Sequence, residues 1–184
     1  MAAGLAIATA PAWAGTFVAM TRHQLVERAD SVIVGRVAAV EPYWDEEHGV
    51  IVSEAVIEVE KKLVGETPEV IRVKTWGGRI GNTVIEASGM PKFQKGERQL
   101  LFLYTRPGEQ VPRVLGYQQG QFRIVEAQDG TEIAKSAVED SVVILGPDRE
   151  PAFFVSDVPL ARLEQEILDL ARSVRPANRQ PVRK

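Results

Sequence analysis

The densest set of side chains that could do chemistry is the run Asp45-Glu46-Glu47-His48. A hard cation such as Ca²⁺ requires several oxygens that converge at about 2.4 Å. Consecutive residues of an extended segment point in different directions, and the D-x-D-x-D-G spacing of a calcium loop is absent. We therefore expect no metal here and interpret the run as the solvated tip of a hairpin.

Nucleophilic catalysis requires a base beside a Ser, Cys or Thr side chain. The chain has no Cys, and its histidines are His23 and His48. Ser88 follows Glu-Ala and so lacks the first glycine of the G-x-S-x-G motif. The sequence therefore favours a protein without a catalytic set or a cofactor. Either histidine could in principle act as a base, and an enzyme of unknown class is kept as the third hypothesis.

A glycine-rich segment, residues 77–82 (GGRIGN), follows a predicted strand, which is where phosphate-binding loops occur. Neither G-x-G-x-x-G nor the Lys-Ser/Thr of a Walker motif is present, and no helical pattern comes next. We expect this loop to connect two strands rather than to bind phosphate.

Aromatic side chains occur near both segments. Tyr43 and Trp44 precede the acidic run, and Trp76 precedes the glycines. Small β-barrels bind sugars or single-stranded chains with aromatic side chains on one face and in the flanking loops. If the rings converge they form a stacking platform, and otherwise they close the ends of the barrel. The candidate ligand-binding residues are Tyr43, Trp44, His48, Trp76, Arg79 and Asn82.

The elements that would position these side chains are mostly strands. Apolar and polar residues alternate with a period of two, which predicts strands. The predicted strands are 31–40, 50–63, 69–76, 98–104 and 114–125. The polar stretch 41–49 is interpreted as a loop or the tip of a long hairpin. Gly35 suggests a bend or bulge, and Asp129-Gly130 predicts a hairpin between two further β-like runs.

Two segments have helical features instead. Residues 21–29 predict a short helix, in which Thr21 and Gln24 form a capping box. Residues 157–173 repeat leucine and isoleucine at helical spacing, with Ser156 or Asp157 as the cap and Pro159 in the first turn. We expect this second helix to lay its leucine face on the barrel.

The N-terminus indicates export. Residues 1–14 are uncharged and end in Ala-Trp-Ala before Gly15, as the second half of a signal peptide does. An apolar first strand is the alternative, and the run is shorter than the ~20 apolar residues of a membrane-spanning helix. We expect a periplasmic or extracellular protein with one domain over 15–174 and a basic, disordered tail over 175–184.

The charge distribution and the amino-acid composition exclude some classes of partner and of binding site. The chain has 22 Lys and Arg against 25 Asp and Glu. Residues 172–184 hold five of the basic residues and no acidic one, so the rest carries 17 basic and 25 acidic residues. An acidic body has no nucleic-acid footprint, which leaves a protein or an envelope polysaccharide as the expected partner. Without Cys, disulfides and cysteine-ligated zinc sites are excluded.

Several runs are similar to a known family. Residues 29–37 (ADSVIVGRV) resemble the opening of netrin-like domains, which include the tissue inhibitors of metalloproteinases. Residues 56–65 (VIEVEKKLVG) and 96–103 (GERQLLFL) look like two further strands of that family. The resemblance covers about residues 21–125 and implies an OB-like barrel.

One departure from the family removes its best-known activity. In the metalloproteinase inhibitors an N-terminal Cys-x-Cys chelates the zinc of the target, whereas this chain has no cysteine. The resemblance therefore implies the barrel alone.

Together these features predict a mainly β protein: a small, closed, OB-like β-barrel with a short N-terminal helix and an amphipathic C-terminal helix. The expected function is an exported, non-enzymatic binding module that uses loops 43–48 and 76–82. The alternatives are a protease inhibitor that acts without a Cys-x-Cys wedge and an enzyme. The oligomeric state is left open.

Overall fold

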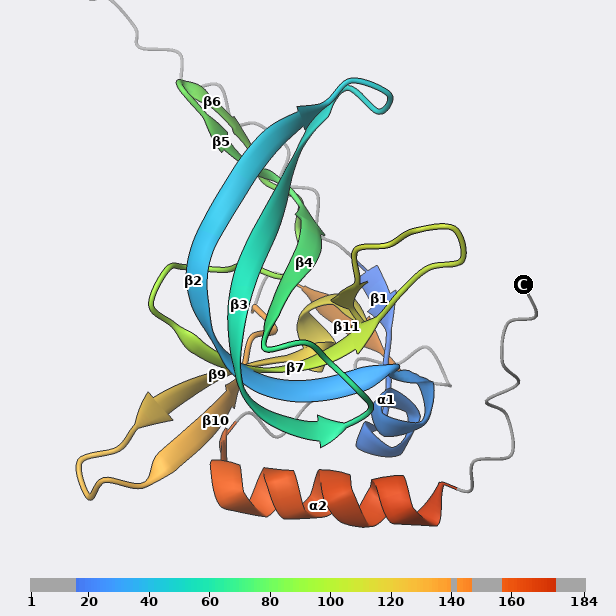
Figure 1. Cartoon of the computed structure of the whole chain (residues 1–184), viewed down its shortest axis with the longest axis vertical. Helices are drawn as coiled ribbons and strands as arrows, with labels where there is room; N and C mark the ends of the chain where they lie inside the picture. The colour runs from blue at the N-terminus through green and yellow to red at the C-terminus, as the bar shows by residue number, and fades with distance from the viewer. Residues whose placement is uncertain (1–15, 140–141, 147–156, 175–184) are drawn as a thin grey trace, which may run out of the picture.

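The computed structural model describes residues 16–139, 142–146 and 157–174. The predicted signal peptide and basic tail lie outside these ranges. The described part is mainly β, as the alternating pattern predicts, and it has two α-helices (Figure 1). The elements are β1 (Thr16–Val18), α1 (Arg22–Arg28), β2 (Ser31–Asp45), β3 (Val50–Val64), β4 (Val70–Trp76), β5 (Gly78–Ile80), β6 (Thr83–Ile85), β7 (Arg98–Tyr104), β8 (Arg113–Val114), the 3₁₀ helix η1 (Tyr117–Gly120), β9 (Gln121–Glu126), β10 (Glu132–Ser136), β11 (Val143–Leu145), β12 (Asp157–Pro159) and α2 (Leu160–Ser173).

Eight strands form the main sheet, in the order β12-β10-β9-β7-β2-β3-β4-β8. The last strand, β8, runs parallel to β4 and also pairs antiparallel with β7, so the pairings return to a strand already in the sheet. The remaining strands β9, β10 and β12 continue from the other end of the order. Figure 1 shows β2 and β3 as a long, curved hairpin whose tip stands far from α2.

The start of β2 (residues 31–35) and most of β7 are buried on both faces, which explains the nearly continuous apolar sequence of these two segments. Side chains of one parity, such as Val32 and Phe102, pack in a core with the two helices. Side chains of the other parity, such as Ile33 and Leu101, pack in a second core with Ala55, Ile57, Val73 and Val114. The alternation of strand side chains thus distributes one apolar run between two cores.

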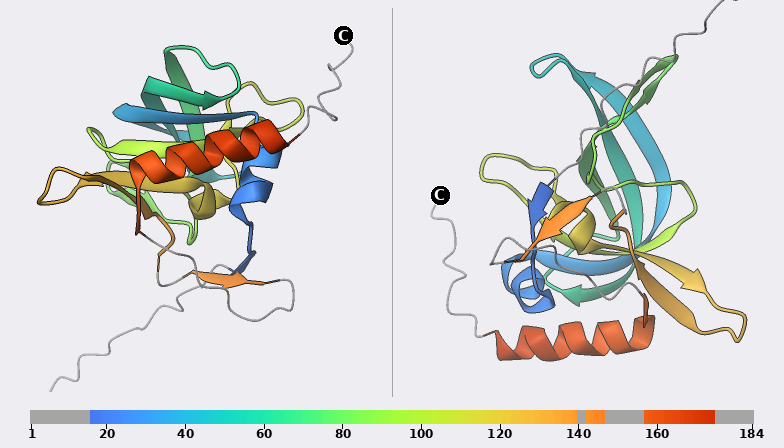
Figure 2. Two further views of the ribbon diagram at one scale, coloured as in Figure 1. Left: turned by 90° about the horizontal axis from the view of Figure 1, so that it is seen from below. Right: turned by 180° about the vertical axis from the view of Figure 1, so that it is seen from behind.

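Both helices lie at the end of the sheet away from the β2–β3 tip (Figures 1 and 2). Helix α1 has the predicted capping box, in which Thr21 and Gln24 satisfy each other's backbone N–H groups. Helix α2 buries Leu160, Leu163 and Ile167, which confirms that its leucine face covers the sheet. Ion pairs from Lys61 to Glu164 and from Arg22 to Glu166 join α2 to β3 and α1.

Glycine permits the tight curvature of the β2–β3 hairpin. The register shifts between Val34 and Gly35, which confirms the predicted irregularity. A Cβ atom at Gly35 would lie 2.6 Å from Cγ2 of Ile57 and 2.7 Å from the carbonyl oxygen of Glu58. No larger side chain fits there without displacing β3, so glycine is what brings the two strands together.

Four predicted boundaries are wrong. Residues 41–45 continue β2 instead of forming a loop, because they pair with β3 up to Asp45, so the alternative interpretation of 41–49 as the end of a long hairpin is confirmed. Residues 77–82 form most of a small hairpin, β5–β6, rather than an open loop. The predicted strand 114–125 is interrupted by η1, and residues 157–159 form β12, which pairs with β10, so that Pro159 precedes α2 as its cap.

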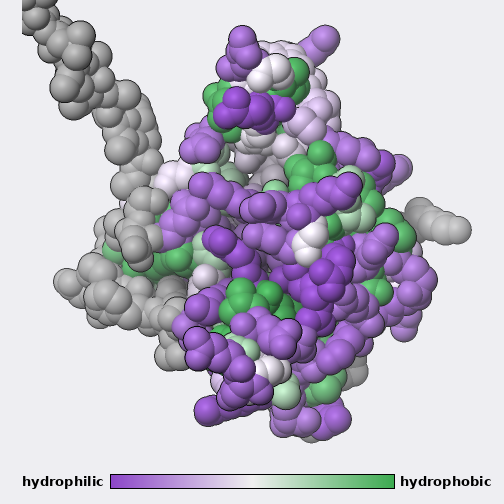
Figure 3. Space-filling view, turned by 90° about the vertical axis from the view of Figure 1, so that its left-hand side faces the viewer, coloured by the Kyte–Doolittle hydropathy of each residue, from purple (hydrophilic) through white to green (hydrophobic). Residues whose placement is uncertain are grey.

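The surface is predominantly polar on the side that bears the β9–β10 hairpin, where apolar side chains form separate patches (Figure 3). Within the described ranges, no helix has the length and apolar character that crossing a membrane requires. The predicted Asp129-Gly130 hairpin is present, since β9 and β10 pair on either side of it.

Candidate functional site

The outer ends of β2, β3 and β4 place two exposed aromatic side chains in one row. Tyr43 pairs with Val52, and Val52 pairs with Trp76 on its other side. Residues directly opposite one another in a sheet project from the same face. Val52 is only 1% exposed, whereas Tyr43 and Trp76 are 37% and 40% exposed. The result is an aromatic row (Tyr43, Val52, Trp76) with two rings open to solvent.

His48 extends this row from the β2–β3 turn. Its ring lies 6.1 Å from that of Trp76, measured between centroids, at an interplanar angle of 50°. Its Nδ1 is 3.2 Å from both carboxylate oxygens of Asp45, and its backbone N–H donates to Oδ1 of the same residue. The predicted segments 43–48 and 76–82 therefore meet at His48 and Trp76.

Charged side chains border the row on the same face. Two residues from Trp76 along β4, Lys74 has its Nζ 5.9 Å from the centroid of the Tyr43 ring, within the range of a cation–π contact. The hydroxyl of Tyr43 donates to Glu54 at 3.4 Å, and Arg72 pairs with Glu41 and Glu54. These contacts orient Tyr43, and the exposed parts of the Tyr43 and Trp76 rings remain open to a ligand.

Trp44 does not join the row. It follows Tyr43 in a regular part of β2, so its side chain leaves the opposite face of the sheet. Trp44 is 47% exposed, which is close to the value for Trp76. The structure thus brings Tyr43, His48 and Trp76 together and separates the third aromatic candidate from them.

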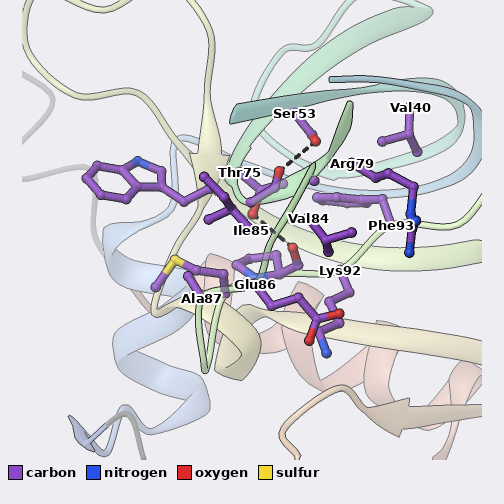
Figure 4. Close-up of a pocket in the computed structure, with 15 residues that line it drawn as sticks. Val40, Ser53, Thr75, Arg79, Val84, Ile85, Glu86, Ala87, Lys92 and Phe93 are labelled. Atoms are coloured by element: carbon purple, nitrogen blue, oxygen red, sulfur yellow. Dashed lines mark hydrogen bonds between the residues drawn. The ribbon is translucent and has the colours of Figure 1, made fainter. Parts of the chain in front are cut away.

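Arg79 and Asn82 belong to the β5–β6 hairpin. Arg79 lines a cavity of about 300 Å³ between this hairpin and the sheet, and Trp76 lines it as well. Figure 4 shows the hydroxyl groups of Ser53 and Thr75 in this cavity; each is committed to a backbone carbonyl, of Gly77 and Pro91 respectively. Asn82 is exposed in the turn of the hairpin, and no described interaction joins it to the other five candidates.

A second cavity, of about 340 Å³, lies on another side of Trp76. Its polar and aromatic lining includes Lys74, Trp76, Tyr104, Arg106, Arg113 and Tyr117. Four of these residues come from β4, β7 and β8, which are adjacent in the pairing order. The basic residues of this cavity were not among the candidates predicted from the sequence. The alternation of residues in the strand predicts that Lys74 points outward, but it does not show which strands lie beside it.

Metal-binding geometry is absent from the described residues, where no group of three or more His, Asp and Glu side chains is placed to hold an ion. No protein-family model, curated protein or solved structure matches the chain.

We expect the position of His48 beside Trp76 to be sensitive to acid, because His48 pairs with the Asp45 carboxylate. The hydrogen bond from His48 holds the pKa of the Asp45 carboxyl below its usual value near 4. A lowered pKa favours the folded arrangement above the usual pKa, and this contribution is lost as the pH falls through the lowered value. We expect the indole N–H signal of Trp76 in NMR spectra to show an inflection below about pH 4.

The control for this pH dependence is Asp45→Asn, which keeps the shape of the side chain and removes its ionisation. The inflection should disappear in this variant while the rest of the acid titration stays the same. An unchanged inflection would show that another carboxylate governs the position of His48.

Proposed function

We propose that the chain is an exported, non-enzymatic binding module that recognises an envelope polysaccharide through its aromatic row. The observation that carries the proposal is the alignment of Tyr43 and Trp76 across three strands, with His48 packed against Trp76. Flat, exposed rings held on a rigid sheet can stack against the apolar faces of sugar rings. Export is part of this proposal and rests on the composition of residues 1–14.

The fold that we propose for this module is OB-like. Five strands pair in the order β2-β3-β4-β8-β7, and β7 pairs with β2 to connect the two ends of this order. The third and fifth of these strands along the chain, β4 and β8, are parallel to each other. OB-type barrels bind oligosaccharides and oligonucleotides on their second and third strands and in two flanking loops. Here those strands are β3 and β4, which hold Val52 and Trp76. The resemblance to netrin-like domains is consistent with the same architecture.

The surroundings of the row favour a sugar chain over a protein. Protein interfaces have a core that is depleted of charged residues. The row instead has Lys74, Glu54 and Arg72 immediately beside its rings. Two separated rings bordered by charges and hydrogen-bonding groups match the alternation of apolar faces and hydroxyl groups on a polysaccharide.

The test is co-sedimentation of the protein with insoluble polysaccharides, including peptidoglycan and cross-linked polygalacturonate. We expect binding to at least one of them, and Trp76→Ala should weaken it about tenfold. Loss of about 60 Å² of ring contact at about 25 cal/mol per Å² corresponds to about 1.5 kcal/mol, which is a factor of about ten in affinity. Tyr43→Ala should have a similar effect.

Trp44→Ala is the matched control, because it removes the same side chain at similar exposure from the opposite face of the sheet. The Trp44→Ala variant should bind the polysaccharide with the same affinity as the unmodified protein. Equal losses for Trp44→Ala and Trp76→Ala would contradict the assignment of the row, and failure to sediment with every polysaccharide would contradict the proposed ligand. Inhibition of a secreted protease at micromolar concentration would favour the alternative instead.

A further inference from the structure

The second cavity begins where the aromatic row ends. Trp76 belongs to both, and Lys74 lies two residues before it on the same face of β4. Lys74 pairs with Arg113 of β8, and Arg113 pairs with Tyr104 of β7. These pairings place the three side chains next to one another on the outer face. A ligand that stacks on Trp76 can therefore reach this cationic cavity (Lys74, Trp76, Tyr104, Arg106, Arg113, Tyr117) directly.

The charged side chains that line the cationic cavity are all basic. Among the described residues that line it are three basic side chains and no Asp or Glu. Glu109 lies beside it and binds Arg113 with two hydrogen bonds, of 2.9 and 3.1 Å. Lys74 and Arg106 form no ion pair with any carboxylate of the described residues. Two cations thus remain available for a ligand, in a body that carries more acidic than basic residues.

Neighbouring groups hold these charges in place. Arg106 Nε donates to the hydroxyl oxygen of Tyr104 at 3.3 Å. The hydrogen bonds from Arg113 lower the pKa of the Glu109 carboxyl, which stays ionised and so keeps Arg113 in position. A concave site lined by charges of one sign concentrates ions of the opposite sign. The cavity is therefore suited to an anion.

Two of the aromatic side chains that line the cavity, Trp76 and Tyr117, are exposed, and Tyr117 has a strained backbone conformation. Tyr117 is 37% exposed and has a φ of 59°, the only positive φ among the described non-glycine residues. A bulky residue in the left-handed region is strained, and such strain persists where the surrounding structure imposes it. Phe17 contacts the ring of Tyr117 at 4.9 Å between centroids. The chain thus keeps an aromatic ring at the cavity despite its conformational cost.

We infer that the cationic cavity binds an acidic sugar residue, a uronate unit of the polysaccharide proposed above. The inference rests on that proposed function and adds the class of sugar. The pyranose ring packs against Trp76 and Tyr117, and its carboxylate binds Lys74 and Arg106. A guanidinium group matches a carboxylate with two parallel hydrogen bonds.

The charge density of the ligand distinguishes a uronate chain from a nucleic acid. DNA carries one charge for about every 1.7 Å of duplex, and its binding sites use many basic side chains. A uronate chain carries one carboxylate per sugar, which two free cations in one pocket can satisfy. The acidic body would repel a dense polyanion, so the observations favour the carboxylate sugar.

The experiment compares calorimetric titrations of the protein with trigalacturonate and with its methyl ester, which has the same shape and no charge. Trimannuronate serves as a second acidic probe. We expect an acid to bind at least tenfold more tightly than the ester, because charged hydrogen bonds are stronger than neutral ones. This preference should decrease as salt rises from 0.05 to 0.5 M, since added ions screen the attraction.

Variants then assign the preference to the cavity. The double variant Lys74→Gln, Arg106→Gln should bind acid and ester equally. Lys95→Gln, which removes an exposed charge outside the cavity, should keep the full preference. Tyr117→Asn removes the ring but tolerates a positive φ, and it should weaken acid and ester by similar factors.

The outcomes separate this inference from the proposed function. If acid and ester bind equally well to the unmodified protein and both depend on Trp76, the aromatic row is a sugar site but the uronate assignment is wrong. If a single-stranded oligonucleotide binds more tightly than either acid, the cavity recognises a different polyanion and the inference fails. If neither the acids nor the ester binds, the uronate inference fails, whereas the proposed function fails only if the protein also sediments with none of the polysaccharides.

Discussion

Replacing Leu163 with alanine is expected to lower the free energy of unfolding by about 2–5 kcal/mol. Leu163 is completely buried in α2, within the core that the helices form with β2, β7 and β10. Truncation removes apolar contacts and leaves a cavity between elements that cannot close it, because α2 is also held by ion pairs. Urea unfolding, followed by circular dichroism, measures the change.

Arg162→Ala provides the matched comparison, since it changes the adjacent, exposed residue of the same helix. Its unfolding free energy should differ by no more than about 0.5 kcal/mol from that of the unmodified chain. The affinity of folded Leu163→Ala protein for its ligand should stay unchanged, because α2 lies at the opposite end of the molecule from the β2–β3 tip (Figure 1). A loss of less than 1 kcal/mol would show that α2 does not complete the core.

Gly65→Ala is expected to lower the free energy of unfolding by about 2–4 kcal/mol. Gly65 has a φ of 73°, and a Cβ atom there would lie 2.2 Å from the carbonyl oxygen of Asp30. Asp30 itself is fixed, because its N–H donates to Leu103 and its carboxylate accepts from the N–H of Thr105. Neither backbone segment can move without breaking contacts at the start of β2.

Gly49→Ala isolates the contribution of this close approach. Gly49 has a similar φ of 64°, but no atom lies within 4 Å of the Cβ position. Its substitution should cost only the left-handed conformation, about 1 kcal/mol. The difference between the two variants in thermal or urea unfolding measures the contact with Asp30. Equal losses would mean that the β3–β4 turn relaxes and that the clash contributes nothing.

Local sequence patterns predicted those parts of the fold that depend on near neighbours. The capping box of Thr21 and Gln24, the irregularity at Gly35 and the Asp129-Gly130 hairpin all depend on residues a few positions apart or on the shape of a single residue. The failure at 114–125 has a specific cause. Gly116 and Tyr117 both adopt positive φ and turn the chain into η1, and nothing in the alternation of apolar residues reports this.

In the candidate site, too, the types of residue could be predicted from the sequence, whereas their arrangement could not. Tyr43 and Trp76 were predicted because they are aromatic residues next to a polar segment and a glycine-rich segment, which the sequence shows directly. Trp44 was grouped with them because the segment was interpreted as a loop, whereas in a paired strand adjacent residues leave opposite faces. The contact between His48 and Trp76 depends on the order β2-β3-β4 and on the register of its pairs, neither of which the local pattern contains.

By itself, the sequence determined that this is a mainly β protein with two capped or amphipathic helices, no disulfides and an acidic body. These properties follow from the period of the apolar residues and from composition. Only the tertiary structure decided that Lys74, Arg113 and Tyr104 lie side by side around Trp76. The physical reason is that strands select their partners through the packing of the whole sheet, so residues distant along the chain become neighbours without any local signal.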